Sequence, residues 1–95
     1  MKIDHIVCPA YIEEKLASKH QVTVREARYV LLSRPRVRFA QKGHIPGDDV
    51  YAAFGQTNGG RYLAVFFVYK PDNHTAIIVS ARDMSDKERR AYGRK

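Results

Sequence analysis

The stretch RYLAVFFVYKPDNHTAIIVSAR, residues 61–82, decides the fold. Residues 61–70 are rich in aromatic and β-branched side chains, and residues 75–82 are apolar on both faces, so each segment predicts a β-strand. Residues 71–74 form the turn between them. We expect a long antiparallel hairpin whose second strand lies inside a sheet. The aromatic side chains of its first strand should lie in the core rather than on a base-stacking surface.

Two further strands precede this hairpin. Residues 50–57 form one, and the Asn-Gly-Gly run at 58–60 is a hairpin turn leading into residue 61. At 36–39 arginine alternates with apolar residues, which is typical of a half-exposed strand at a sheet edge, where charge discourages further pairing. Residues 42–48 form a loop. The sequence therefore predicts four antiparallel strands.

Two helices are expected before the sheet. Pro9 suits the first turn of a helix that runs to about His20, because the N–H that proline lacks would be unpaired there. Thr23, followed three residues later by Glu26, forms a capping box that opens a second helix. Pro35 ends this helix.

A second capping box, Ser85 with Glu88, opens a short basic helix after the sheet. The predicted fold class is therefore α+β, with two N-terminal helices, a four-stranded antiparallel sheet and a C-terminal helix. At this length we expect one domain spanning residues 1–95.

The charge is strongly and unevenly positive. Lys and Arg number 17 against 10 Asp and Glu, which gives a net charge of +7 and a pI near 9.8. Residues 11–44 carry eight basic and three acidic side chains, residues 85–95 carry five and two, and residues 45–84 are nearly neutral. A polyanion such as nucleic acid is the first partner to consider.

Several function classes find no support in the sequence. The four histidines and Cys8 are scattered without metal-ligand spacing, and neither a P-loop nor a GxGxxG motif is present, so we expect no metal and no cofactor. A single cysteine and an N-terminus without a secretory signal favour the reducing cytoplasm. No apolar run approaches the roughly 20 residues that cross a bilayer, so we expect no membrane insertion.

The remaining reactive side chains are those a metal-free ribonuclease uses: a base for the 2′-OH, cations for the transition state and a proton for the leaving oxygen. If the strands of the hairpin pair directly across their turn, Leu63 lies opposite Arg82, and Arg61 and Arg82 are diagonal neighbours roughly 7–8 Å apart on one face. They could then share a phosphate. A one-residue slip would separate them, and in the alternative interpretation each pairs with Asp83 or Glu88.

Each of the other candidate site residues has two alternative interpretations. Lys19 and His20 lie at the end of the first predicted helix. Either both interact with the helix end as a cap, or His20 acts as a general acid or base. Arg36 and Arg38 either contact phosphates or serve solubility. Tyr92 either stacks on a base or packs on the sheet.

The chain resembles the BrnT family of bacterial toxins in four short motifs, which together cover roughly residues 12–92. Residues 60–65 (GRYLAV) look like the family's G-R-x-L-x-V, residues 78–82 (IVSAR) look like I-S-A-R, and residues 88–92 (ERRAY) look like E-R-x-x-Y. Residues 19–27 (KHQVTVREA) look like its K-H-G segment followed by [ST]-x-x-E-A. Their combined order and spacing are fairly specific.

This resemblance implies a RelE-like fold and a ribonuclease toxin of a type II toxin–antitoxin system. It implies metal-independent RNA cleavage that inhibits translation. It also implies a BrnA-like ribbon-helix-helix antitoxin that neutralises the toxin. Operator DNA is then bound only through this antitoxin. The active group that it implies is Lys19, His20, Arg61, Arg82 and Glu88. The RNA-binding candidates are Arg36, Arg38, Arg89 and Tyr92.

The chain also departs from the family pattern. Gln21 stands where the family has glycine after K-H, the N-terminal Trp-Asp pair is missing, and Asp49 and Val50 stand where many members have Glu-Arg. Asp49 is a weaker site candidate. A two-residue loop after the second strand would turn it away from Arg61, and a three-residue loop would turn it toward Arg61.

Two functions from other classes also fit the composition. The first is a small nucleic-acid-binding module without catalysis, which the positive charge supports equally well. The second is a protein-interaction module whose apolar sheet face an acidic partner covers.

Overall fold

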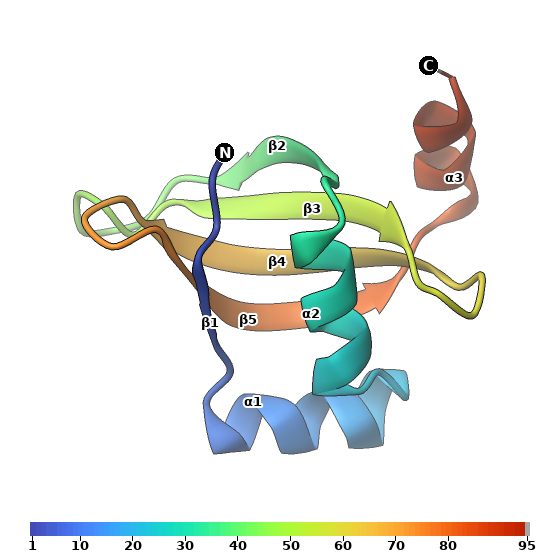
Figure 1. Cartoon of the computed structure of the whole chain (residues 1–95), viewed down its shortest axis with the longest axis horizontal. Coiled ribbons are helices and arrows are strands. Elements are labelled where there is room, and N and C mark those ends of the chain that lie inside the picture. The colour runs from blue at the N-terminus through green and yellow to red at the C-terminus, as the bar shows by residue number, and fades with distance from the viewer. Residues whose placement is uncertain (95) are drawn as a thin grey trace.

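The computed structural model describes residues 1–94, and Figure 1 shows the order of the elements. They are β1 (His5–Val7), α1 (Ala10–Lys15), the π-helix η1 (Leu16–His20), α2 (Val24–Leu32), β2 (Arg36–Gln41), β3 (Val50–Gln56), β4 (Tyr62–Lys70), β5 (Thr75–Asp83) and α3 (Asp86–Gly93). The predicted α+β class is confirmed. No helix within residues 1–94 is long and apolar enough to cross a membrane.

The strands form one sheet in the order β1-β5-β4-β3-β2. Strands β2 to β5 are antiparallel neighbours, and β2 lies at an edge, as predicted. The prediction of four strands is wrong, because β1 pairs in parallel with β5, with His5 opposite Thr75. The backbone N–H groups of Asp4 and His5 both donate to the carbonyl of His74, at 2.8 and 3.2 Å. A strand of three residues is too short to show a period of two in the sequence.

The first helix lies where it was expected, with two differences. Pro9 precedes the helix as its N-cap instead of occupying its first turn, and its carbonyl accepts from the N–H groups of Ile12 and Glu13. The last turn, η1, is π-helical and ends at Gln21, which adopts a left-handed conformation with φ of 52°. Left-handed backbone is costly for a residue with a Cβ atom.

Both predicted capping boxes are present. In α2, the N–H of Glu26 donates to Oγ1 of Thr23 at 3.1 Å, and the N–H of Thr23 donates to Glu26 Oε1 at 3.0 Å. In α3, the same reciprocal pair joins Ser85 and Glu88, at 3.1 and 2.8 Å. These bonds satisfy helix N-terminal donors and fix where each helix begins.

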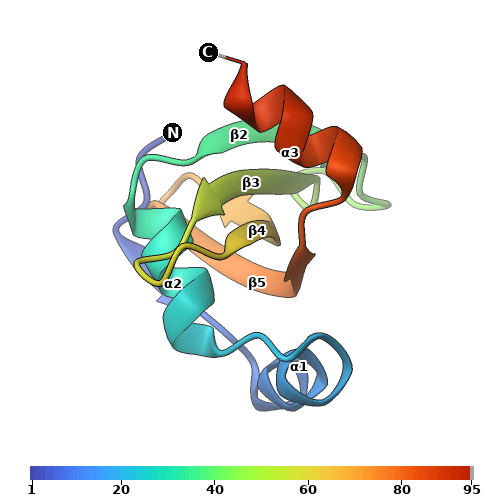
Figure 2. The ribbon, with the colours of Figure 1, turned by 90° about the vertical axis from the view of Figure 1, so that its right-hand side faces the viewer.

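The helices are divided between the two faces of the sheet. Figure 2 shows α2 beside the sheet, α1 below β5, and α3 beside β2 and β3, away from both. Leu63, Val65 and Phe67 alternate along β4 and are fully buried against the side of α1, η1 and α2. Gly55 allows α2 to approach closely, because a Cβ atom there would lie 3.0 Å from Cγ1 of Val30. The core is therefore on one face, and the other face is open to α3 and solvent.

A β-bulge in β5 changes the predicted register of the central hairpin. Pairing begins as predicted next to the turn, but it shifts between Phe66 and Phe67, whose partners are Ser80 and Ile78. Val79 is therefore an extra residue on β5. Such a bulge reverses which face each later side chain occupies.

Beyond the bulge, Ala64 and not Leu63 lies opposite Arg82, and Leu63 lies opposite Asp83. The prediction that Arg61 and Arg82 are diagonal neighbours on one face is therefore wrong. Arg82 instead shares the face of Ala64, on the side of α3.

Candidate functional site

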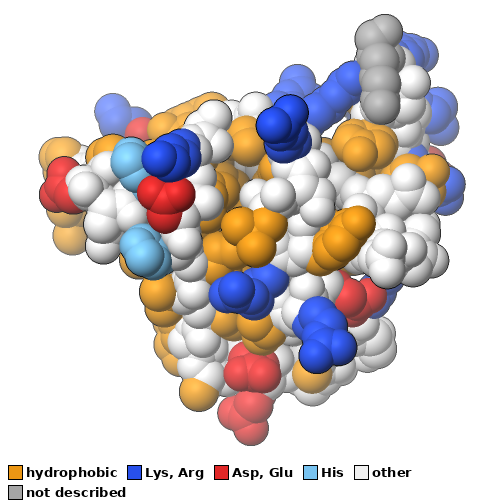
Figure 3. All heavy atoms as spheres, in the orientation of Figure 1, with side chains coloured by type: hydrophobic (Ala, Val, Ile, Leu, Met, Phe, Trp, Pro, Cys, Tyr) orange, Lys and Arg blue, Asp and Glu red, His pale blue; other side chains and the backbone are white. Residues whose placement is uncertain are grey.

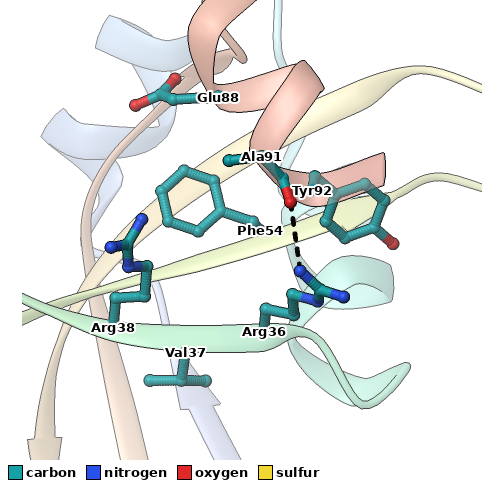
Figure 4. Close-up of a pocket in the computed structure, with 7 residues that line it drawn as sticks. All are labelled: Arg36, Val37, Arg38, Phe54, Glu88, Ala91 and Tyr92. Carbon is teal, nitrogen blue, oxygen red and sulfur yellow. Dashed lines mark hydrogen bonds between the residues drawn. The ribbon is translucent and has the colours of Figure 1, made fainter. Parts of the chain in front are cut away.

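A cavity of about 530 Å³ opens between α3 and the sheet face opposite the core. Figure 4 shows Arg36 and Arg38 from β2, Phe54 from β3, and Glu88 and Tyr92 from α3 around it. The two arginines meet Phe54 because the register places Arg36 opposite Phe54. The sequence-predicted residues Arg36, Arg38, Glu88 and Tyr92 are thus brought together.

The two arginines of β2 have different surroundings. Arg36 Nη1 donates to the carbonyl oxygen of Ala91 at 3.2 Å, and its guanidinium carbon lies 5.7 Å from the ring centre of Tyr92. This places a cation at the negative C-terminal end of α3 and ties that helix to β2. Arg38 is exposed and forms none of the hydrogen bonds drawn in Figure 4. Its charge is therefore available to an anionic ligand.

Glu88 forms a two-point ion pair with Arg82 beside the cavity. Arg82 Nη1 and Nη2 donate to the two carboxylate oxygens at 2.7 and 2.9 Å. These bonds, together with the bond from the backbone of Ser85, lower the pKa of Glu88 to about 2, against an opposing effect of burial. The guanidinium of Arg82 also lies 5.2 Å from the ring centre of Phe66. Glu88 is therefore ionised at neutral pH and holds Arg82 in one orientation.

Aromatic and cationic groups continue beyond the cavity along α3. Arg89 lies over Tyr62 at 4.3 Å from its ring centre, and Tyr62 meets Tyr92 edge to face at 6.1 Å. Arg89 does not line the cavity but extends its cationic rim. Such alternation of guanidinium groups and aromatic rings suits a nucleic acid, since the former bind phosphates and the latter stack on bases.

Arg61 is enclosed on the other face, among the helices. Its guanidinium donates to Asp83 at 2.7 and 3.3 Å, to Glu26 at 3.3 Å, and to the backbone carbonyls of His20 and Gln21 at 3.0 and 2.6 Å. The bonds to Asp83 raise the pKa of Arg61 and lower the pKa of Asp83. Arg61 thus holds the end of η1 against the sheet.

Lys19 and His20 belong to this second group. Both end η1, where Lys19 is exposed and His20 is half-buried, close enough for its charge to lower the pKa of Asp83. The five predicted catalytic residues therefore form two groups at one end of the sheet. Lys19, His20 and Arg61 lie on the helix face, and Arg82 and Glu88 lie on the cavity face.

Asp49 joins neither group. Thr57 pairs with Arg61 through a backbone bond of 2.8 Å, so the loop is the three-residue form that turns Asp49 toward the face of Arg61. However, Asp49 lies at the opposite end of β3, where its carboxylate accepts from the N–H of Gly43 at 2.9 Å. It stabilises the loop before β3.

Sequence reasoning missed three parts of this arrangement. Phe54 was not singled out, and Phe66, expected in the core, is half-buried on the cavity face beneath Arg82. Glu26 was expected only as a cap, yet it also binds Arg61. Nothing in the sequence singles out Phe54, because its position opposite Arg36 depends on the register of β2 and β3, which shifts between Phe39 and Gln41. Residues 1–94 hold no group of three His, Cys, Asp or Glu placed to bind a metal ion.

The chain is similar to known proteins in sequence family and in fold. A family model described as the ribonuclease toxin BrnT of type II toxin–antitoxin systems matches residues 13–88. The chain is similar to the crystal structure, at 1.1 Å resolution, of the Brucella abortus ribonuclease toxin BrnT, with a TM-score of 0.61 and 17% sequence identity. That match covers 90% of this chain and 100% of the other, and at this identity it shows the fold. No curated protein matches the chain.

Proposed function

Because the chain belongs to the BrnT family of ribonuclease toxins of type II toxin–antitoxin systems, we propose that it is an endoribonuclease that cleaves RNA without a metal ion and so inhibits translation. We further propose that it acts in the cytoplasm, where its RNA substrate lies. The observation that supports this best is the cavity under α3, which combines Arg36 and Arg38 with Phe54 and Tyr92. Its volume of about 530 Å³ lies within the range of small-molecule sites, so it has room for part of a nucleotide.

The proposed reaction begins with attack of the ribose 2′-oxygen on the neighbouring phosphorus. The bond from O2′ to phosphorus forms and the bond from phosphorus to O5′ breaks, while one base takes the 2′-OH proton and one acid protonates O5′. Negative charge builds on the phosphoryl oxygens in the transition state. Arg82, oriented by Glu88, and Arg38 supply fixed positive charge there, the role that a metal ion has in other nucleases.

The proton transfers need a different group from Glu88. A carboxylate with a pKa of about 2 is a weak base, so we assign Glu88 to positioning Arg82. Histidine is the side chain whose ordinary pKa is nearest neutrality, and His20 lies at the same end of the sheet as Arg82 but on the opposite face. For His20 to act, the RNA has to pass around this end of the sheet. We therefore retain His20 as the candidate acid or base and Arg61 as the residue that positions it through its backbone carbonyl.

We propose a BrnA-like ribbon-helix-helix protein as the antitoxin, with operator DNA bound only through it. A type II system has a protein antitoxin, which family membership implies for this chain. The excess of basic side chains in residues 11–44 indicates that this antitoxin is acidic where it contacts the toxin.

The purified chain, incubated with RNA in excess EDTA, tests the proposal. We expect products that end in a 2′,3′-cyclic phosphate and begin with a 5′-OH. Arg82→Ala should remove turnover while RNA binding is largely kept, and the control Arg90→Ala, on the exposed side of α3, should cleave normally. Loss of all cleavage in EDTA would refute the metal-independent mechanism. Gradual loss of affinity without any measurable cleavage would instead identify a nucleic-acid-binding module.

A further inference from the structure

Within residues 1–94, no strand pairs with the outer edge of β2. It ends the sheet, and the backbone pairing of residues 36–41 within the described chain is with β3 alone. The opposite edge, β1, is only three residues long. An exposed edge of six residues offers a row of N–H and C=O groups on which another chain can add a strand.

A groove of about 310 Å³ lies directly beside this edge, on the helix face. Its walls combine apolar side chains with one arginine: Met1, Ile3, Leu31, Leu32, Pro35 and Val37, together with Arg34. Met1 is 59% exposed and Leu32 is 54% exposed, although both are large and apolar. Figure 3 shows hydrophobic side chains at the surface in this region, where α2 and the N-terminal segment lie. Large apolar side chains that are exposed close to one another are a feature of interaction sites.

The two faces of β2 therefore differ in chemistry. Arg36 and Arg38 point to the cavity, and Val37 and Phe39 point to the groove side, where Phe39 is 58% exposed and meets Tyr51 edge to face at 6.1 Å. A strand added to β2 would place alternate side chains on these two faces. Acidic side chains would pair with the arginines, and apolar side chains would cover the groove.

We propose that β2 and this groove bind an extended segment of the antitoxin in which acidic and apolar residues alternate. The inference rests on the antitoxin of the proposed function. Charge complementarity supports this occupant, because Arg34, Arg36, Arg38 and Lys42 surround the edge. A second copy of the chain fits poorly, since two β2 strands side by side would bring arginines against arginines. The acidic side chains of the added strand would also cover the cavity and exclude RNA from it.

The test uses the full chain in complex with the antitoxin encoded by the adjacent reading frame. Hydrogen exchange of the β2 amides is compared in the free chain and in the complex. Binding is then measured for Leu32→Gln and Phe39→Gln, with Val7→Gln on the opposite edge as the matched control, since Val7 is 47% exposed. We expect slower exchange at residues 36–41 in the complex and binding weakened about tenfold or more by the first two changes only.

Cleavage of RNA by each free variant keeps this inference separate from the proposed function. Leu32 lies outside the cavity, so Leu32→Gln should cleave RNA as the parent chain does while it escapes the antitoxin. If the β2 amides exchange equally fast in the complex, or if Val7→Gln weakens binding as much as Leu32→Gln, the β2 interface is wrong. If the free chain cleaves no RNA at all, the proposed function fails instead. Dimerisation of the free chain through β2 would show that the occupant is a second copy.

Discussion

Arg61 and Arg82 extend from opposite faces of the same sheet, although both lie at the end next to α3. Arg61 binds Asp83 and the end of η1, and Arg82 binds Glu88 on α3. Each guanidinium is therefore held by its own carboxylate, and the two arginines are separated by the sheet. Substitutions at the two positions should have different consequences.

At Arg82 we expect an effect on turnover. Arg82→Ala should raise the barrier to cleavage by about 2.7–4 kcal/mol if the guanidinium acts as one donor to the developing charge. Arg82→Lys should remain impaired, because lysine lacks the planar two-point geometry seen with Glu88. Single-turnover kinetics on a short RNA measure both, and parent-like rates in Arg82→Ala would exclude this role.

At Arg61 we expect an effect on stability. Arg61→Ala would remove the hydrogen bonds to Asp83, to Glu26 and to the carbonyls of His20 and Gln21, and should cost about 1.5–3 kcal/mol of unfolding free energy. Urea unfolding measures this loss. A variant with parent-like stability but no turnover would place Arg61 in the chemistry instead. If Arg61→Ala still folds, a shifted pH profile of its RNA cleavage would support the role of Arg61 in positioning His20.

At Gln21 we expect a gain in stability. Its φ of 52° is strained for glutamine but free for glycine, so Gln21→Gly should stabilise the chain by about 1 kcal/mol. The gain is reduced by losing the bond from Gln21 Nε2 to the carbonyl of Ser18, at 3.2 Å. Thermal melting checks this, with Gln21→Ala as the control that loses the side chain without relieving the backbone. Equal melting temperatures for both variants would contradict the strain.

The ion pair of Glu88 and Arg82 should make the free energy of unfolding depend on pH. The pKa of Glu88 falls from an ordinary 4.5 to about 2 on folding, so its stabilisation is complete above about pH 4.5 and is lost as the pH falls toward 2. Glu88→Gln should therefore destabilise the chain at pH 6 and much less at pH 2.5. Denaturant unfolding at the two pH values measures the difference. Glu14→Gln, at an exposed carboxylate, serves as the comparison. A difference between Glu88→Gln and the parent chain that stays constant with pH would show that charge is not the cause.

The attacking group can be tested through the RNA. If the ribose 2′-oxygen attacks, an RNA with a single 2′-deoxy nucleotide at the scissile position should resist cleavage while still binding. Competition with the all-ribose RNA measures the binding, and gel analysis measures the cleavage. Cleavage of the deoxy substrate at the same bond would require water as the nucleophile.

Much of the fold could be predicted because local signals are strong. Both capping boxes and the apolar run of residues 61–70 act over a few neighbouring residues, and the structure contains each of them. The short strand β1 could not be predicted, since its partner is β5, about 70 positions later in the chain. A parallel pairing so distant in sequence leaves no local pattern.

The site was predicted less well for a related reason. The sequence indicates a cationic set of candidate residues, but which of them share a face depends on pairing register. Val79 interrupts the alternation within an apolar segment where every residue suits a strand, so nothing in IVSAR marks the bulge. The cavity likewise depends on Arg36 of β2 reaching the last turn of α3, 55 residues away.

The bulge at Val79 also bears on how this chain should be aligned with distant relatives. Deletion of that one residue would restore plain alternation and leave Arg82 opposite Ala64 and Asp83 opposite Leu63, so that Arg82 would keep Glu88 of α3 and Arg61 would keep Asp83. A relative with one residue fewer between the 71–74 turn and its final arginine should therefore carry its gap inside the strand, at position 79, rather than in the turn. In such a relative an arginine and an acid should stay in the order that this chain has at Arg82 and Asp83, each on the same face as here.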